Sequence, residues 1–268
     1  IRDHCVTGVQ TCALPIFINH MLSKSYLTII LFASIFFSSC SSIYMPGVPN
    51  TPMLTTKGEF AGGAHVSLRG NVNVNSAYAV SDHLAAMVNF GFLDIQKKRK
   101  DIDHRYFEIA GGYFKTFGPD DNRILEFYAG MGTANSFRVF RDFDDGVLVN
   151  SDIYDAKYTK TFVQANYSSK KTSKVRLLGI DFGLNYGTAW RLSFVSTNDF
   201  KLNGIPTPNE DNIFIEPVFF TRMVLSEQFQ LQYTSGSNIG LRNRKYLNAG
   251  HSVFSVGAVI NLGRKPKK

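Results

Sequence analysis

The chain has 268 residues, of which 44% are hydrophobic, 13% aromatic and 19% charged, and its net charge is +8. This apolar content excludes a disordered chain, and three cysteines are too few for a disulfide-stapled miniprotein. The composition also argues against a helical multi-span membrane protein, because only one stretch approaches the ~18 consecutive apolar residues of a spanning helix.

The first twenty residues differ from the rest of the chain. They lack an initiator methionine, and residues 6–16 read VTGVQTCALPI. This string resembles the translation of a sequencing-library adapter, so we interpret residues 1–20 as an artefact fused to a gene that begins at Met21. Cys5 and Cys12 belong to this part of the chain.

Residues 21–39 have the features of a signal peptide. One positive charge, Lys24, precedes an apolar run over 27–37 that is too short to span a bilayer comfortably. Two serines and then Cys40 follow, an arrangement that resembles a bacterial lipobox. We therefore expect Cys40 to be the acylated N-terminus of a lipoprotein, stably anchored by several acyl chains. The alternative is ordinary cleavage near Ser39, which would leave a free thiol.

Residues 40–58 are rich in proline. The part that reads SSIYMPGVPNTPMLTTK contains three prolines and one glycine. This composition is typical of an extended linker, so we expect a tether between the lipid and the fold.

From residue 59 onward, apolar and polar residues alternate with period two, as in β-strands. For example, Phe229, Leu231 and Tyr233 alternate with glutamines. The range 174–197 is interpreted as one long strand with a glycine kink, because splitting it at Gly187 would give an odd count. Ten strands are expected, with eight or twelve as alternatives, at about 59–68, 71–80, 84–93, 105–116, 123–134, 156–167, 174–197, 212–225, 228–236 and 251–262.

The composition of the two faces indicates where these strands lie. One face carries the aromatic and aliphatic residues, and the other carries Gly, Asn, Gln and isolated charges. Lipid-facing apolar residues opposite a polar lumen are typical of a membrane barrel, and segments of about ten residues suit tilted membrane strands. The sequence therefore predicts an all-β, closed, antiparallel up-and-down transmembrane barrel over 59–262, followed by a basic tail at 263–268.

The predicted connections alternate in length, as in outer-membrane barrels, which have short periplasmic turns and longer outer loops. The short connections are expected at 81–83, 117–122, 168–173 and 226–227. The longer ones are expected at 94–104, 135–155, 197–211 and 236–250.

The lipobox, the proline-rich lead ending in PMLTTKGEF and the following NSAYAVSDHLAAMVNFGF together resemble lipid-anchored outer-membrane β-barrel proteins of the Bacteroidota. The resemblance covers residues 21–262. It implies residence in the bacterial outer membrane and handling by the barrel-insertion and lipoprotein-sorting machinery, and it brings no established activity. The final NLGRKPKK departs from the terminal aromatic of many such barrels. Cys40 is followed by Ser41 and Ser42, and not by an acidic run of the kind that resembles a surface-export signal. The lipid is therefore expected in the periplasmic leaflet.

The alternation also predicts a group of charged side chains inside the barrel. A ten-stranded barrel is narrow, so side chains should fill its lumen and opposite charges should neutralise one another. A narrow polar path for small solutes or ions is the alternative interpretation. The charged residues expected in the lumen are Glu108, Glu126, Asp181, Glu216, Arg191 and Arg222.

Catalysis is the third interpretation. A rim hydrolase, acting on peptide or lipid, could use Asp101, Asp103 and His104 in one outer loop, with His251 and Ser252 at another position. No second carboxylate pair accompanies them, so we expect no enzyme. No metal or nucleotide motif occurs, and no cofactor is expected.

Basic runs such as KKRK at 97–100 suit contact with outer-membrane lipid headgroups or lipopolysaccharide phosphate. Nucleic acid is excluded as a partner by the expected compartment, and oligomeric state is not predicted. The sequence thus favours a structural or interaction role.

Overall fold

The computed structural model of the chain describes residues 42–177, 179–249 and 252–263, with the backbone alone for 171–173 and 177. The predicted artefact, the signal peptide and Cys40 lie outside these ranges. Within them, a search for helices of membrane-spanning length and hydropathy finds none. A short 3-10 helix, Pro119–Asp121, joins β4 to β5. The strands are β1 (Phe60–Ser67), β2 (Val72–Ala79), β3 (Leu84–Lys97), β4 (Lys100–Phe117), β5 (Arg123–Asp144), β6 (Val147–Leu177), β7 (Ile180–Leu202), β8 (Ile205–Pro206), β9 (Asp211–Val224), β10 (Phe229–Gly236), β11 (Ile239–Gly240) and β12 (Val253–Leu262).

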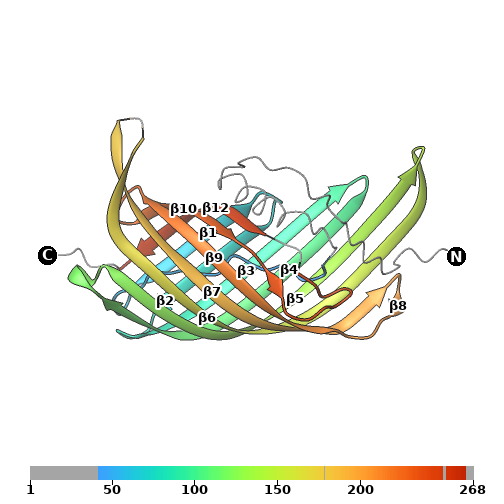
Figure 1. The fold of residues 1–268 in the computed structure, drawn as a ribbon, viewed down its shortest axis with the longest axis horizontal. Helices are drawn as coiled ribbons and strands as arrows, with labels where there is room; N and C mark the ends of the chain where they lie inside the picture. Colours follow the sequence, from blue (N-terminus) through green and yellow to red (C-terminus); the bar gives the residue numbers. More distant parts are fainter. Residues whose placement is uncertain (1–41, 178, 250–251, 264–268) are drawn as a thin grey trace, which may run out of the picture. The chain divides into compact units, whose positions relative to one another are not determined.

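Ten of these strands close into an antiparallel barrel (Figure 1). The order around the barrel is β1, β2, β3, β4, β5, β6, β7, β9, β10 and β12, and β12 pairs again with β1. Phe60 lies opposite Leu262 and Ser67 opposite Ser255, so the first and last strands are joined along their length. The two-residue strands β8 and β11 pair only with β7 and β9. The prediction of a closed ten-stranded antiparallel barrel is confirmed.

The connections define two ends of the barrel, which we name for use below. The turn end carries the connections 80–83, 118–122, 178–179 and 225–228, together with the start of β1 and the end of β12. The loop end carries the connections 68–71, 98–99, 145–146, 203–210 and 237–252.

The turn between β6 and β7 is not where the sequence indicated. Residues 168–173 lie within β6, where the pairing with β7 shifts between Ser169 and Ser173, and the chain reverses at Gly179 with a φ of 83°. The Ser/Lys-rich string was interpreted as a turn from its composition. It is instead part of a hairpin that reaches beyond its neighbours (Figure 1), where strands tolerate polar residues on both faces.

Three of the predicted outer loops, 94–104, 135–155 and 197–211, also consist largely of strand residues. β3 and β4 extend through 94–104 to a tight turn, and β5 and β6 extend through most of 135–155. Asp145 and Gly146 have φ values of 46° and 83°, and Asn203 and Gly204 have 54° and 79°. Asp-Gly and Asn-Gly pairs with positive φ at both positions are the preferred two-residue hairpin turns, which explains the abrupt reversals.

Large apolar side chains cover the outward face of the strands, and polar side chains point into the barrel together with small residues and some aromatic residues. In β10, Phe229, Leu231 and Tyr233 are 51%, 39% and 51% exposed. Gln230 and Gln232, which alternate with them, are 3% and 1% exposed. A soluble fold shows the opposite arrangement, because burying apolar groups is what stabilises it in water.

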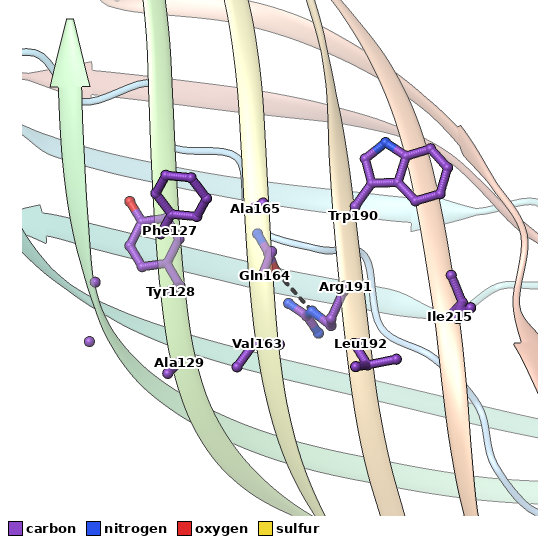
Figure 2. A pocket seen from close by; sticks show the side chains of 12 residues that line it. Phe127, Tyr128, Ala129, Val163, Gln164, Ala165, Trp190, Arg191, Leu192 and Ile215 are labelled. Carbon is purple, nitrogen blue, oxygen red and sulfur yellow. Dashed lines mark hydrogen bonds between the residues drawn. The ribbon is translucent and has the colours of Figure 1, made fainter.

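Neighbouring residues of one strand lie in two different environments, one outside the barrel and one in the lumen. On the outward face, Phe127, Ala165 and Trp190 help to line an apolar hollow of about 580 Å³ (Figure 2). Trp190 is 52% exposed, whereas the adjacent Arg191 is buried on the lumen side and donates to Gln164 at 2.8 Å. The two faces predicted from the alternation are therefore present in the fold.

Candidate functional site

Residues 42–57 form what we call the lumen segment, and residues 42–54 of it lie inside the barrel. Tyr44, Met53 and Leu54 are each 1% exposed, and the whole stretch from Ser42 to Leu54 is buried. The prediction of a tether outside the fold is therefore wrong for this stretch. A proline-rich chain has few internal hydrogen bonds, so its backbone groups need partners. Polar side chains on the lumen face of the strands supply them.

The lumen segment runs from the loop end to the turn end. At the loop end, the Ile43 N–H donates to the Tyr246 carbonyl at 2.9 Å, and the Ser42 hydroxyl donates to the Asn248 carbonyl. At the turn end, the Gly58 N–H donates to the Ala79 carbonyl at 2.9 Å, directly before β1 begins. The segment therefore crosses the full lumen before the chain enters the barrel wall.

Tyr44 and Arg138 hold the part of the segment nearest the loop end. The Arg138 guanidinium donates to the Ser42 carbonyl and, at 2.8 Å, to the Ile43 carbonyl. The Tyr44 ring stacks on Phe214 with centroids 4.4 Å apart. These contacts join the segment to β5 and β9 at once.

A buried charge cluster surrounds Tyr44. Glu108 accepts from Lys160 Nζ at 2.8 Å and from Arg191 Nη1 at 3.1 Å. Glu216 accepts from the Tyr44 hydroxyl, and its other oxygen lies 3.9 Å from Lys160 Nζ. Two carboxylates thus face two cations, which offsets much of the cost of removing these charges from water.

The charge cluster continues to the middle of the segment. Arg191 donates to Gln164 at 2.8 Å, shown as a dashed line in Figure 2. Gln164 and Asn166 in turn donate to the Asn50 carbonyl at 2.7 and 3.1 Å. Tyr44 and Asn50 are therefore linked through one network of hydrogen bonds and ion pairs in the wall.

Arg222 and Glu126 hold the segment closer to the turn end. Arg222 donates to the Thr51 carbonyl and, at 3.2 Å, to its hydroxyl. Glu126 accepts from the Leu54 N–H at 3.3 Å and from Asn166 at 3.1 Å. Backbone groups of the segment are thus bound directly by the charged lumen residues.

Near the turn end, the segment enters an apolar socket instead. The Leu54 side chain packs in one cluster with four small residues of β1, β2 and β3 and with two aromatic residues of β4 and β5. Small side chains leave the room that this leucine fills. The residues packed with it include Ala61, Ala77, Ala79, Ala85, Phe114 and Tyr128.

Five of the six charged residues predicted for the lumen are buried there, and Asp181 is not. Asp181 lies in the β6–β7 hairpin beyond the lumen, with its carboxylate 3.6 Å from Arg176 and 52% of its side chain exposed. The alternation of apolar and polar residues continues past the end of the barrel, so alternation alone placed Asp181 in the lumen, where it does not lie. The five buried residues are Glu108, Glu126, Glu216, Arg191 and Arg222.

Lys160 and Arg138 were missed by the sequence reasoning. Lys160 has the same parity as Gln164 and Asn166 in β6, and this pattern could have placed it in the lumen. Arg138 lies in a stretch of β5 that was interpreted as a loop, so no face was assigned to it.

The residues considered for a rim hydrolase do not form one group. His104 is fully buried and lies 2.8 Å from the Tyr158 hydroxyl, whereas Asp103 pairs with Arg105 at the surface. Asp101 pairs with Arg141, and His251 lies outside the described residues. In the described part of the chain, no group of three or more His, Cys, Asp or Glu side chains could hold a metal ion.

The space left around the segment is small. A cavity beside Tyr44, Tyr106 and Lys160 measures about 10 Å³, and another beside Thr51 and Arg222 measures about 10 Å³. A single water needs about 10–15 Å³, so neither cavity holds more than one.

Comparison with known proteins gives fold-level likeness alone. No family model and no curated protein sequence matches the chain. Among solved structures, the translocator domain of autotransporter NalP from Neisseria meningitidis is similar at 10% identity and a TM-score of 0.39, over 76% of this chain and 84% of that one. The FpvAI–pyocin S2 complex is similar at 10% identity and a TM-score of 0.22, over 80% of this chain and 42% of that one.

Proposed function

We propose that the chain is an outer-membrane β-barrel lipoprotein with a structural or interaction role, whose lumen is closed by residues 42–57. The observation that carries the proposal is the inverted wall, apolar outside and polar inside, around a lumen filled by the chain itself. Strands of eight or more residues with an apolar outer face suit a bilayer, where only a closed barrel satisfies the backbone groups of β-strands.

The proposal includes acylation of Cys40, supported by the lipobox resemblance of the sequence. It also includes contact with anionic headgroups or lipopolysaccharide phosphate through basic residues such as those at 97–100, at the loop end. It includes no catalytic activity, since the candidate rim residues are dispersed.

The filled lumen favours this role over a channel. Ions and small solutes need a continuous polar path, and the cavities measured beside the lumen segment are each about 10 Å³. We therefore expect the intact protein not to conduct.

Planar-bilayer recording tests the proposal. The full chain should insert without stepwise current, and a variant lacking residues 42–57 should give discrete steps because its polar lumen is emptied. Heat-modifiable migration of both proteins in gels would verify that each barrel is folded. Equal steps from both proteins would overturn the closed lumen. A mature chain that stays monomeric in water without detergent would overturn membrane residence.

A further inference from the structure

The lumen segment has a fixed direction, and this direction decides where the chain before it must lie. Ser42 and Ile43 are bound at the loop end by Asn248 and Tyr246, and Gly58 is bound at the turn end by Ala79. The described chain therefore begins at the loop end, on the opposite side of the barrel from the start of β1.

The rim holds its end of the segment through an ordered loop. Glu210 accepts from the backbone N–H groups of Lys245, Tyr246 and Leu247 at 3.2, 3.0 and 2.8 Å. Asn212 donates to the Leu247 carbonyl at 2.7 Å. These bonds shape the 241–249 loop, whose carbonyl groups then receive the first residues of the segment.

Apolar packing strengthens the same contact. Ile43 and Tyr44 belong to one buried cluster with Val195, Phe214 and Leu247, which come from β7, β9 and the loop. The Tyr246 ring lies beside Phe200 with centroids 4.8 Å apart. The emergence of the segment at the loop end is thus a packed part of the fold.

We infer that the chain preceding Ser42 leaves the barrel through the loop end, so that this protein holds its own N-terminus on the outer surface of the cell. The inference rests on the proposed function, and it takes the loop end, which carries the two longest connections, 203–210 and 237–252, as the end that faces outward. Cys40 precedes Ser42 by two residues, which span at most about 7 Å, so acyl chains on Cys40 would enter the membrane at the loop end.

This inference revises the leaflet expected from the sequence. Acyl chains on Cys40 would enter the outer leaflet beside the loop end instead of the periplasmic leaflet. The lumen segment would then connect a surface lipid to the barrel wall.

Cysteine labelling on intact cells tests the inference with the full chain. After removal of residues 1–39, Cys40 is the sole cysteine of the sequence, and acylation blocks its thiol. Four single-cysteine additions are compared with the wild-type chain, using a membrane-impermeant maleimide before and after lysis. They are Ser41→Cys before the segment, Asn150→Cys at the loop end, Glu227→Cys at the turn end and Val48→Cys within the lumen.

The expected result is that Ser41→Cys is labelled on intact cells at a rate within about twofold of Asn150→Cys. Glu227→Cys should need lysis, Val48→Cys should need unfolding, and the wild-type chain should stay unlabelled. Heat-modifiable migration verifies that each variant is folded.

The contrary outcomes are distinguishable. If Ser41→Cys is labelled only after lysis while Asn150→Cys is labelled on intact cells, the surface position is wrong and the membrane barrel stands. If Asn150→Cys and Glu227→Cys are labelled equally on intact cells, the proposed function itself is wrong. Labelling of the wild-type chain on intact cells would overturn acylation of Cys40 while supporting its surface position.

Discussion

The part of the lumen segment near the loop end and the part near the turn end are held by different interactions. Residues 42–51 are bound by charged and amide side chains that reach the segment from β2, β3, β5, β6 and β9. Residues 53–54 instead pack against alanines and aromatic rings. Hydrogen bonds fix the register of the chain, because each donor must find its acceptor. The leucine socket adds burial without polar requirements, so it anchors the end from which β1 starts.

The largest expected effect is at Glu108, which tests the polar half. Glu108→Gln would remove the carboxylate that pairs with both Lys160 and Arg191 and would leave only Glu216, 3.9 Å from Lys160 Nζ. Breaking a buried ion pair in this way costs about 3–5 kcal/mol. The free energy of unfolding in urea, followed by Trp190 fluorescence in detergent or liposomes, measures this loss. Asp103→Asn is the matched control, because the Asp103–Arg105 pair is exposed and should contribute only about 0–1 kcal/mol. Equal losses in the two variants would mean that the charge cluster does not support the fold.

Leu54 tests the apolar half. Leu54→Ala would leave a cavity among side chains already as small as alanine, and such truncations cost about 2–5 kcal/mol. Leu84→Ala on the outward face removes the same atoms from a side chain that is 57% exposed, and should cost less than Leu54→Ala because the surroundings fill the space and no cavity is left. The same urea titration compares them. A similar loss at both positions would show that the socket is not selectively packed.

Gly47 lies within the polar part, residues 42–51, and tests how closely the wall surrounds the segment. A Cβ at Gly47 would lie 2.1 Å from the Tyr106 hydroxyl oxygen, and Tyr106 is itself held by a 2.6 Å hydrogen bond to Asn73. Gly47→Ala should therefore destabilise the fold by about 1–3 kcal/mol, the usual cost of overpacking. Gly111→Ala is the control, because nothing lies within 4 Å of the added atom. No difference between the two alanine variants in urea unfolding would contradict this close fit.

The smallest effect concerns the rim above the polar half. Hydrogen bonds from Arg242 and then Arg244 lower the pKa of Asp211 from its ordinary value of 3.8. A lowered folded-state pKa means that the stabilisation is present above the ordinary value and is lost as the pH falls through the lowered one. Amide exchange in the 241–249 loop, corrected for its intrinsic pH dependence, should therefore rise at acidic pH.

Asp211→Asn is the control for this pH effect. It removes the carboxylate at every pH, so its loop exchange should already be raised near neutral pH and should lack the acidic transition. An unchanged transition in this variant would assign the effect to another group.

The fold was predictable from the sequence because the decisive signal is local. The alternation of Phe229, Leu231 and Tyr233 with glutamines assigns two faces without any knowledge of the partner strands. The same parity placed Glu108 and Arg191 on the lumen side. It failed at Asp181, because a strand that continues into water keeps its period after the barrel has ended.

The lumen segment was not predictable in the same way. The proline-rich composition of residues 42–57 is typical of a linker. No pattern within these residues indicates that their hydrogen-bond partners lie far away in the chain. Tyr44 reaches Glu216 and Thr51 reaches Arg222, each separated by more than 170 residues. The barrel has to be closed before these contacts exist, so they follow from the tertiary fold and from no local pattern.

The passage of the lumen segment directly into β1 has a mechanical consequence. A pull on the chain at Ser42, directed out of the loop end, would be transmitted along the segment to Gly58 and then to the first strand. That strand is paired with β2 on one side and β12 on the other, from Phe60 to Ser67 along β12. The load therefore acts along these ladders, and many hydrogen bonds must break together before the chain yields. The pairing of β1 with β12, which closes the barrel, would therefore resist a force applied to the N-terminal end of the segment.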